Sequence, residues 1–288
     1  MRTIDLDSLE IFRTVVTEGG VVRAAGKLNR VQSNVTTRIQ QLEERLGHKL
    51  FRREGRSLAL SAAGAALLPY ADRLLRLADE AEAGFKTGLP LGTFRLGSLE
   101  STAGSRLAPV LSRFHKLYPG VVVELVTGTT GALIQRVNAF EIEAAFVSEP
   151  FSAPGLATQP VFEEELVLVT ARSVAAVTRP SDLAQSTLIA FANGCSYRRL
   201  LEQWLGNGGV APARSLEFSS YQAMIACVAA GTGFAIVPVS VLKALRATAD
   251  VRQHALPERI RTSRTQLVWR GTPSVALLRL CEMLLPKP

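Results

Sequence analysis

The chain has 288 residues, of which 47% are hydrophobic and 20% are charged, which excludes a largely disordered protein and suggests about two domains. Its net charge of +8 fits a polyanionic partner. The longest apolar stretch, 224–242, is broken by two glycines and a proline, so it does not predict a membrane span.

Acidic residues at the N-terminus stand where a signal peptide needs an apolar core, so we expect a cytoplasmic protein with no membrane partner. The three cysteines, Cys195, Cys227 and Cys281, are odd in number and widely spaced. This spacing argues against a disulfide framework and against a zinc site.

The first sixty residues have the pattern of three helices. Apolar residues recur at helical spacing from Leu6 to Val16 and end at Gly19-Gly20, and a short second helix is expected over about 22–28. The third helix is expected from Gln32 to Leu46. Polar and basic side chains gather around its start, and these are our candidates for DNA contact: Arg30, Gln32, Ser33, Asn34, Thr36, Thr37 and Arg38.

Short hydroxyl and amide side chains suit base edges and phosphates, whereas a merely solvated helix face favours Glu and Lys. The alternative is that Ser33 and Asn34 simply begin the helix as capping residues. Residues 19–60 also contain nine basic and three acidic residues, a net charge of +6. The excess positive charge of the chain is therefore concentrated here.

A β-hairpin is expected after the third helix. Leu50-Phe51 begins one strand, Glu54-Gly55 marks a turn, and Leu58 and Leu60 alternate on the returning strand. Such a wing would bring basic side chains to phosphates or to the minor groove. A solvated charged hairpin is the alternative. The candidates are Arg52, Arg53 and Arg56.

A long helix is expected from about 62 to 85, with Ser61 as its N-cap. At 1.5 Å per residue it would be about 35 Å long. Its apolar residues are spaced as a heptad seam, which favours pairing with a second copy; the alternative is packing on the chain's own C-terminal domain. The seam consists of Leu67, Ala71, Leu74, Ala78, Ala81 and Phe85.

The last two hundred residues alternate between strands and helices, which predicts a parallel sheet with crossover helices in two α/β subdomains. We divide the chain into a DNA-binding domain (1–60), a dimerising linker and hinge (61–88) and a regulatory domain (89–288). Within the latter, subdomain I spans about 91–162 and 267–288, and subdomain II about 163–266.

Ligands of such folds bind at the carboxyl ends of strands. Five polar loops follow predicted strands here, and together they predict a cleft for a small molecule, although ordinary helix capping explains each loop alone. Hydroxyl groups and helix N-termini suit a carboxylate, whereas Glu100 suits an ammonium group. The candidates are Ser98, Glu100, Ser101, Thr102, Thr127, Gly128, Thr129, Ser148, Cys195, Ser196, Tyr197 and Tyr221.

Enzymatic function is not predicted. The three histidines, His48, His115 and His254, are scattered, and no nucleotide-binding fingerprint is present. We therefore expect no catalytic residue, no metal and no cofactor. An activated thiol at Cys195 is the alternative to a small structural residue there.

The segment RAAGKLNRVQSNVTTRIQQLEERLGHKLFRREGRSLALSAAG resembles the DNA-binding region of LysR-type transcriptional regulators. The resemblance implies an α/β protein with an N-terminal winged helix-turn-helix, a long linker helix and a two-subdomain effector domain like that of periplasmic binding proteins. It also implies a homotetramer built as a dimer of dimers. Val31, Asn34 and Thr37 depart from the common pattern, so the helix needs another N-cap, for which Asn29 is a candidate.

RLGSLESTAG, NGCSYRRLLEQW, SSYQAMIACVAAGTG and LVWRG are similar to a subgroup of these regulators tied to putrescine and related amine or amino-acid catabolism. This similarity implies double-stranded DNA as one partner and an amine, diamine or amino acid as the effector. Two alternatives remain: a DNA-bending scaffold with a vestigial cleft, and a small-molecule-binding protein or enzyme fused to a DNA anchor.

Overall fold

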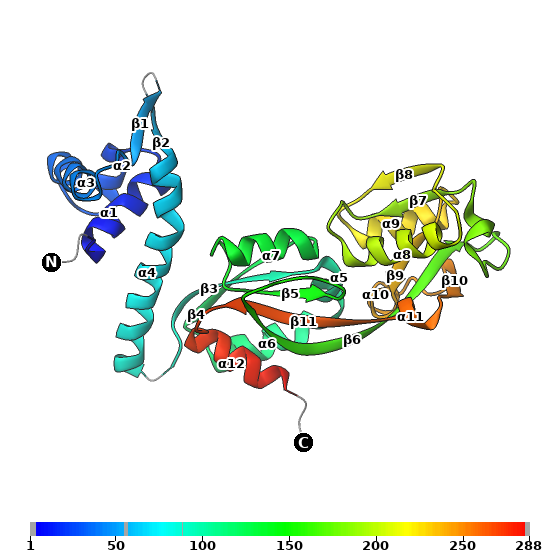
Figure 1. Cartoon of the computed structure of the whole chain (residues 1–288). Coiled ribbons are helices and arrows are strands. Elements are labelled where there is room, and N and C mark those ends of the chain that lie inside the picture. The colour runs from blue at the N-terminus through cyan, green and yellow to red at the C-terminus, as the bar shows by residue number, and fades with distance from the viewer. Residues whose placement is uncertain (1–3, 55–56, 88, 286–288) are drawn as a thin grey trace. The chain divides into compact units, whose positions relative to one another are not determined.

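The computed structural model describes residues 4–54, 57–87 and 89–285, and it divides into two compact units, Met1–Gly92 and Thr93–Pro288 (Figure 1). The first unit contains the helices and the hairpin, and the second contains the α/β fold. The predicted fold class is therefore confirmed. None of the helices in the described ranges is both long and apolar enough to cross a membrane.

The N-terminal unit is a three-helix core with a wing and a long helix. Its apolar stripes meet in one cluster that includes Leu9, Phe12, Val35 and Leu42, all fully buried. The elements are α1 (Leu6–Thr17), α2 (Val21–Lys27), α3 (Gln32–Leu46), β1 (Phe51–Glu54), β2 (Ser57–Leu60) and α4 (Ala62–Thr87).

Helix α4 begins where the sequence places it. The Ser61 hydroxyl accepts a hydrogen bond from the backbone N–H of Gly64 at 3.0 Å, as an N-cap does. The expected seam requires a correction, because Ala71 is fully buried in the core of its own unit and is not available to a partner helix. Among the described residues of α4, the large apolar side chains with the highest exposure are Tyr70, Leu74 and Leu77, at 57%, 41% and 49%.

The C-terminal unit contains a seven-stranded sheet in the order β10-β6-β11-β5-β3-β4, with β9 also paired to β6. A small sheet of β7 and β8 accompanies it. The strands are β3 (Gly92–Ser98), β4 (Val121–Thr127), β5 (Ala144–Ser148), β6 (Leu156–Ala171), β7 (Thr187–Ala190), β8 (Arg214–Glu217), β9 (Ala235–Pro238), β10 (Val251–Ala255) and β11 (Thr262–Arg270).

The sheet is mixed, which corrects the expectation of a parallel one. Strands β3 and β5 are parallel, as are β7 and β8, but β11 runs antiparallel to both β5 and β6. The reason is the length of β6. Its first part, to Glu165, pairs with β11, and its last part, from Leu166, pairs with β9 and β10. Strand β6 thus continues from one subdomain into the other.

Helices cover the sheets of both subdomains. The helical elements are α5 (Glu100–Thr102), a π-helix (Ala103–Leu107), α6 (Ala108–Leu117), α7 (Thr130–Asn138), a 3-10 helix (Pro180–Leu183), α8 (Ser196–Asn207), α9 (Tyr221–Ala229), α10 (Val239–Ala244), α11 (Glu258–Arg261) and α12 (Val275–Leu284). Their apolar faces form separate cores, around Phe146 and Leu277 in one subdomain and around Phe234 and Leu201 in the other. Loops of both subdomains therefore meet beside the strands that join them.

Candidate functional site

The start of α3 presents an open polar surface. Gln32, Ser33, Asn34 and Thr37 are exposed, and Thr36 is half-buried with its hydroxyl donating to the Gln32 carbonyl at 3.0 Å. The opposite face packs through Val35, Ile39 and Leu42. The amphipathic pattern predicted from the sequence is therefore present, and the polar face is free of the unit's core.

The N-cap of α3 differs from the expectation. The cap position is occupied by Val31, whose side chain makes no capping hydrogen bond and is 69% exposed. Asn29 lies earlier in the turn with a left-handed φ of 53° and does not cap the helix. The amide side chain of asparagine tolerates this left-handed conformation, which makes Asn29 suitable for the turn between α2 and α3.

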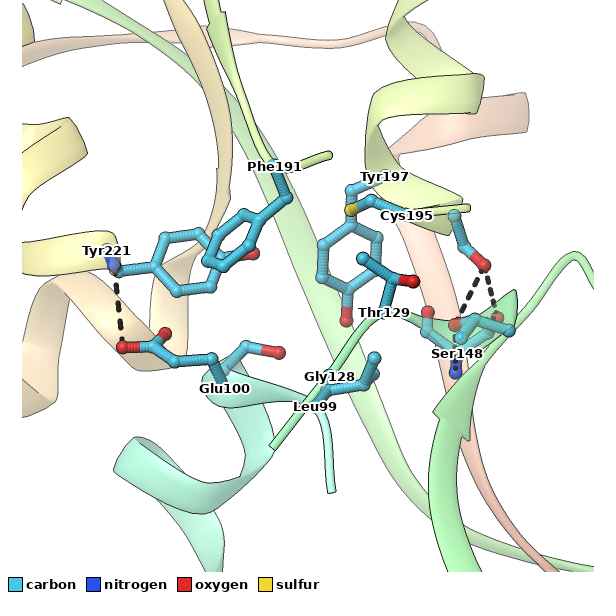
Figure 2. Close-up of a pocket in the computed structure, with 12 residues that line it drawn as sticks. Leu99, Glu100, Gly128, Thr129, Ser148, Phe191, Cys195, Tyr197 and Tyr221 are labelled. Carbon is cyan, nitrogen blue, oxygen red and sulfur yellow. Dashed lines mark hydrogen bonds between the residues drawn. The ribbon is translucent and has the colours of Figure 1, made fainter. Parts of the chain in front are cut away.

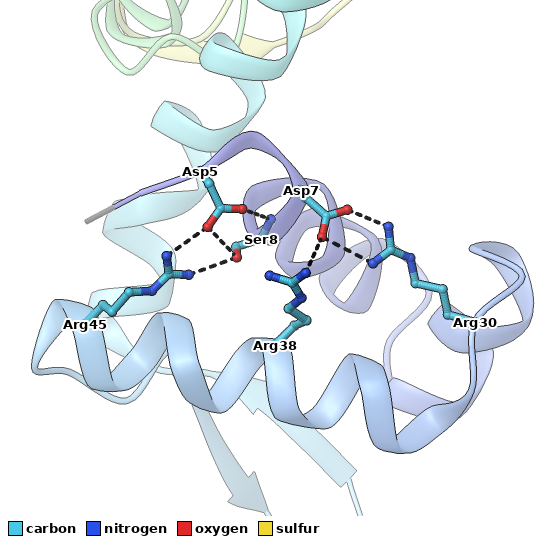
Figure 3. A network of polar contacts seen from close by, with 6 residues as sticks. All are labelled: Asp5, Asp7, Ser8, Arg30, Arg38 and Arg45. Atoms are coloured by element: carbon cyan, nitrogen blue, oxygen red, sulfur yellow. Dashed lines mark hydrogen bonds and ion pairs between the residues drawn. The ribbon is translucent and has the colours of Figure 1, made fainter. Parts of the chain in front are cut away.

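Two carboxylates at the start of α1 hold arginines beside α3 (Figure 3). Asp7 contacts Arg30 at 2.5 Å and Arg38 at 3.7 Å. Asp5 contacts Arg45 at 2.9 Å, while Ser8 accepts a second hydrogen bond from that guanidinium at 3.0 Å. Asp7 raises the pKa of Arg30, and the Ser8 backbone N–H lowers the pKa of Asp5.

The wing is anchored by a buried glutamate that the sequence does not single out. Glu43, on α3 and only 6% exposed, accepts hydrogen bonds from the backbone N–H groups of Leu50 at 2.8 Å and Phe51 at 3.3 Å. It also pairs with Lys49 at 2.7 Å. Among the wing candidates, Arg52 is exposed, the Arg53 side chain is not described, and Arg56 lies outside the described residues.

A pocket lies in the C-terminal unit at the meeting of both subdomains (Figure 2). Nine of the twelve predicted effector residues line it. Ser98 and Thr102 are instead buried in the fold, and Thr127 faces solvent outside the lining. The lining residues are Leu99, Glu100, Ser101, Gly128, Thr129, Thr130, Ser148, Phe191, Cys195, Ser196, Tyr197 and Tyr221.

Leu99 and Phe191 were not among the predicted pocket residues. Leu99 lies between Ser98 and Glu100, so its place along the chain was a usable signal. Phe191 directly follows the buried strand β7, a position that is typical of a core residue. Its ring lies 4.8 Å from that of Tyr221, between centroids, and forms part of the pocket wall.

Glu100 is the only charged residue in the described lining. Its Oε1 accepts a hydrogen bond from the Tyr221 backbone N–H at 3.4 Å, at the start of α9. Burial raises the pKa of Glu100, and the hydrogen bond from Tyr221 opposes this effect. A bound cation would offset the cost of burying this carboxylate.

Ser196 joins the two subdomains at the other side of the pocket. Its hydroxyl lies 2.7 Å from the Ser148 carbonyl oxygen and 3.1 Å from the Thr130 hydroxyl. It also lies 3.2 Å from the Pro150 carbonyl oxygen. These contacts connect α8 in one subdomain to α7 and β5 in the other.

A second polar connection lies where β6 crosses between the subdomains. Glu164, 2% exposed, accepts hydrogen bonds from Arg106 at 2.8 Å and Ser240 at 2.6 Å. The Ser105 hydroxyl lies 3.3 Å from that of Ser240.

The described residues contain no cluster of three or more His, Cys, Asp or Glu side chains arranged to hold a metal ion.

Comparison with known proteins gives matches over both units. Residues 6–65 match the family "Bacterial regulatory helix-turn-helix protein, lysR family", and residues 87–286 match "LysR substrate binding domain". The chain is 36% identical over 268 residues to the HTH-type transcriptional regulator GltR of Bacillus subtilis (strain 168), covering 93% of this chain and 90% of that protein.

Two solved structures have the same fold. A full-length variant of OxyR from Pseudomonas aeruginosa gives a TM-score of 0.73 at 18% identity, covering 99% of this chain and 94% of that one. Full-length CbnR complexed with its target DNA gives 0.67 at 24% identity, covering 98% and 99%. At this level of identity the likeness concerns the fold alone.

Proposed function

The chain belongs to the LysR family of DNA-binding transcriptional regulators and is not an enzyme, and from that premise we propose that a small cationic effector in the pocket controls its binding to DNA. The effector is an amine, diamine or amino acid, and the regulated genes serve catabolism of such compounds. Residues 1–60 bind DNA, 61–88 form the linker and 89–288 bind the effector.

On DNA, the open start of α3 enters the major groove, where Gln32, Ser33 and Thr37 reach base edges. Arginines of the wing lie near phosphates or the minor groove. The exposed apolar stripe of α4 pairs with the same stripe of a second chain, and two such dimers form a tetramer. Pairing two DNA-binding units strengthens binding because the second contact becomes intramolecular.

The observation that carries the effector proposal is the charge of the pocket. Glu100 is half-buried and no basic residue accompanies it in the described lining, so an anionic ligand would meet an uncompensated carboxylate. A ligand with an ammonium group would instead pair with it. The aromatic rings of Phe191 and Tyr221 beside Glu100 add further stabilisation for a cation.

Glu100→Gln is expected to abolish the rise in melting temperature that a cationic effector produces, because the amide removes the charge and keeps the shape. The measurement is a thermal-shift screen of amines, diamines, amino acids and carboxylates with the full chain. Glu141→Gln changes the net charge equally at an exposed position of the same unit and should retain the shift. An unchanged shift in Glu100→Gln would remove the cationic effector from consideration.

Gln32→Ala is expected to weaken binding to the preferred operator by about 1–3 kcal/mol and to leave binding to unrelated DNA unchanged, as for a base contact. The operator can be selected from random-sequence DNA before affinities are measured at fixed salt. The same assay applied to Arg38→Ala tests whether that side chain, although 3.7 Å from Asp7, also reads a base. Equal weakening on all sequences would identify either residue as a phosphate contact.

A scaffold without an effector is the competing function. It predicts no stabilisation by any compound in the screen and DNA bending that no compound changes. An enzyme is excluded by the family, so turnover of a stabilising compound is not expected.

A further inference from the structure

The carboxylate of Asp7 contacts two of the arginines that the sequence offers for DNA contact (Figure 3). Arg30 pairs with it at two points, since Nη1 donates to Oδ2 at 3.2 Å and Nη2 to Oδ1 at 2.5 Å. The Arg38 guanidinium lies 3.7 Å from Oδ2 of the same carboxylate. Arg30 precedes α3 and Arg38 lies in its second turn, so one acid on α1 engages arginines on both sides of the start of α3.

These ion pairs lie where solvent reaches them. The side chains of Asp7 and Arg30 are 36% and 33% exposed, and that of Arg38 is 42% exposed. An ion pair at such a position contributes little to folding, because water and salt screen it and because two long side chains must be held in one geometry. The arginines can therefore exchange the carboxylate of Asp7 for another anion without disturbing the core of the unit.

A DNA phosphate is the anion that would replace Asp7 in a protein of a DNA-binding family. A guanidinium group binds carboxylate and phosphate through the same two-point geometry, so the donors that Arg30 gives to Asp7 are not available to a phosphate at the same time. A phosphate contact by Arg30 must first break the contact with Asp7. The carboxylate that remains then repels the DNA.

We propose that Asp7 is a positioning residue that competes with DNA phosphates for Arg30 and Arg38, and that it thereby limits the affinity of the protein for DNA of any sequence. Contacts to bases by neutral side chains such as Gln32 are not subject to this competition. A larger share of the binding free energy then depends on the base sequence, because phosphate contacts carry no sequence information. The inference requires the DNA binding that the family shows, and it is independent of the effector proposed above.

Asp7→Asn is expected to raise the affinity for a duplex of unrelated sequence about three- to tenfold at about 0.1 M salt, where the counterions released by one phosphate contact contribute up to roughly eightfold. Fluorescence anisotropy with the full chain measures this change. Glu10→Gln is the matched control, because it removes an equal charge at an exposed position of the same helix. It should raise the affinity less than about twofold, since salt screens an exposed charge.

A double-mutant cycle assigns the gain to the arginines. Arg30→Gln alone should lower the affinity for unrelated DNA less than about twofold, because Asp7 already neutralises this side chain, and a larger loss would overturn the proposal. In the Asp7→Asn background the same substitution should remove at least about half of the gain. Misfolding lowers affinity, so it cannot imitate the expected increase. An affinity of Asp7→Asn no higher than that of Glu10→Gln would refute the competition, as would a gain that persists in full after Arg30→Gln and Arg38→Gln together.

Discussion

Gly64→Ala is expected to destabilise the N-terminal unit by about 3 kcal/mol, the upper end of the range for overpacking, although alanine is the better helix former. A Cβ atom at Gly64 would lie 2.2 Å from the Leu50 carbonyl oxygen and 2.7 Å from the Leu60 side chain. The Leu50 carbonyl already accepts from the Ser61 N–H at 2.9 Å, so it is not free to move. The change therefore separates α4 from the wing.

Thermal unfolding followed by circular dichroism measures this effect, and DNA affinity should fall with it. Gly26→Ala provides the matched control, because Gly26 lies in α2 of the same unit with open space around the added methyl group. It should stabilise the unit by about 0.5–1 kcal/mol through helix propensity. Similar effects of the two substitutions would show that the close approach of Gly64 to the Leu50 carbonyl does not determine the stability of the unit.

Glu43→Ala is the second change with a large expected effect, a loss of about 2–3 kcal/mol. It leaves the buried Leu50 N–H without an acceptor and removes a charged hydrogen bond to Lys49. For a unit of this size the loss corresponds to a decrease in melting temperature of at least about 8 °C. The wing should also lose its fixed position relative to α3, so DNA binding should weaken more than stability alone explains.

Glu44→Ala is the control for this prediction. Glu44 is the exposed neighbour of Glu43 on α3, and its replacement removes the same charge. It should leave the melting temperature within about 4 °C of the wild type, because exposed substitutions usually change stability by less than about 0.5 kcal/mol. If Glu43→Ala behaves like Glu44→Ala, the carboxylate does not anchor the wing.

Local patterns were sufficient for much of this fold. The spacing of Val35, Ile39 and Leu42 predicts α3 with its observed ends, because an amphipathic stripe depends only on neighbours along the chain. The polar loops that follow β3, β4 and β5 were predicted to meet because strand ends of one sheet share an edge. Phe191 could not be recognised as a pocket residue, since an aromatic residue after a buried strand has the same pattern whether it faces a core or a cavity.

Contacts between distant segments were not available from the sequence. Ala71 has the spacing of a seam residue, yet its own unit buries it, because the period of a helix does not reveal which surface covers a given face. The sequence around Glu43 is typical of an exposed acidic residue, and only the contact with the backbone of the wing shows that it is buried. Strand β10 has no sequence signal of its own, because Arg252, Gln253 and His254 form no alternating apolar pattern.

The carboxylates at the start of α1 have a consequence for the response of DNA binding to salt. Each phosphate that a lysine or arginine neutralises releases condensed counterions, and log K falls by about 0.9 per contact against log salt. If all nine basic residues of 19–60 made such contacts, the slope of log K against log salt would be on the order of −8. Arg30, Arg38 and Arg45 already neighbour Asp7 and Asp5, so titration of affinity against salt should give a slope shallower by about 2–3. Complexes of this domain would then persist over a wider range of ionic strength than its basic composition suggests.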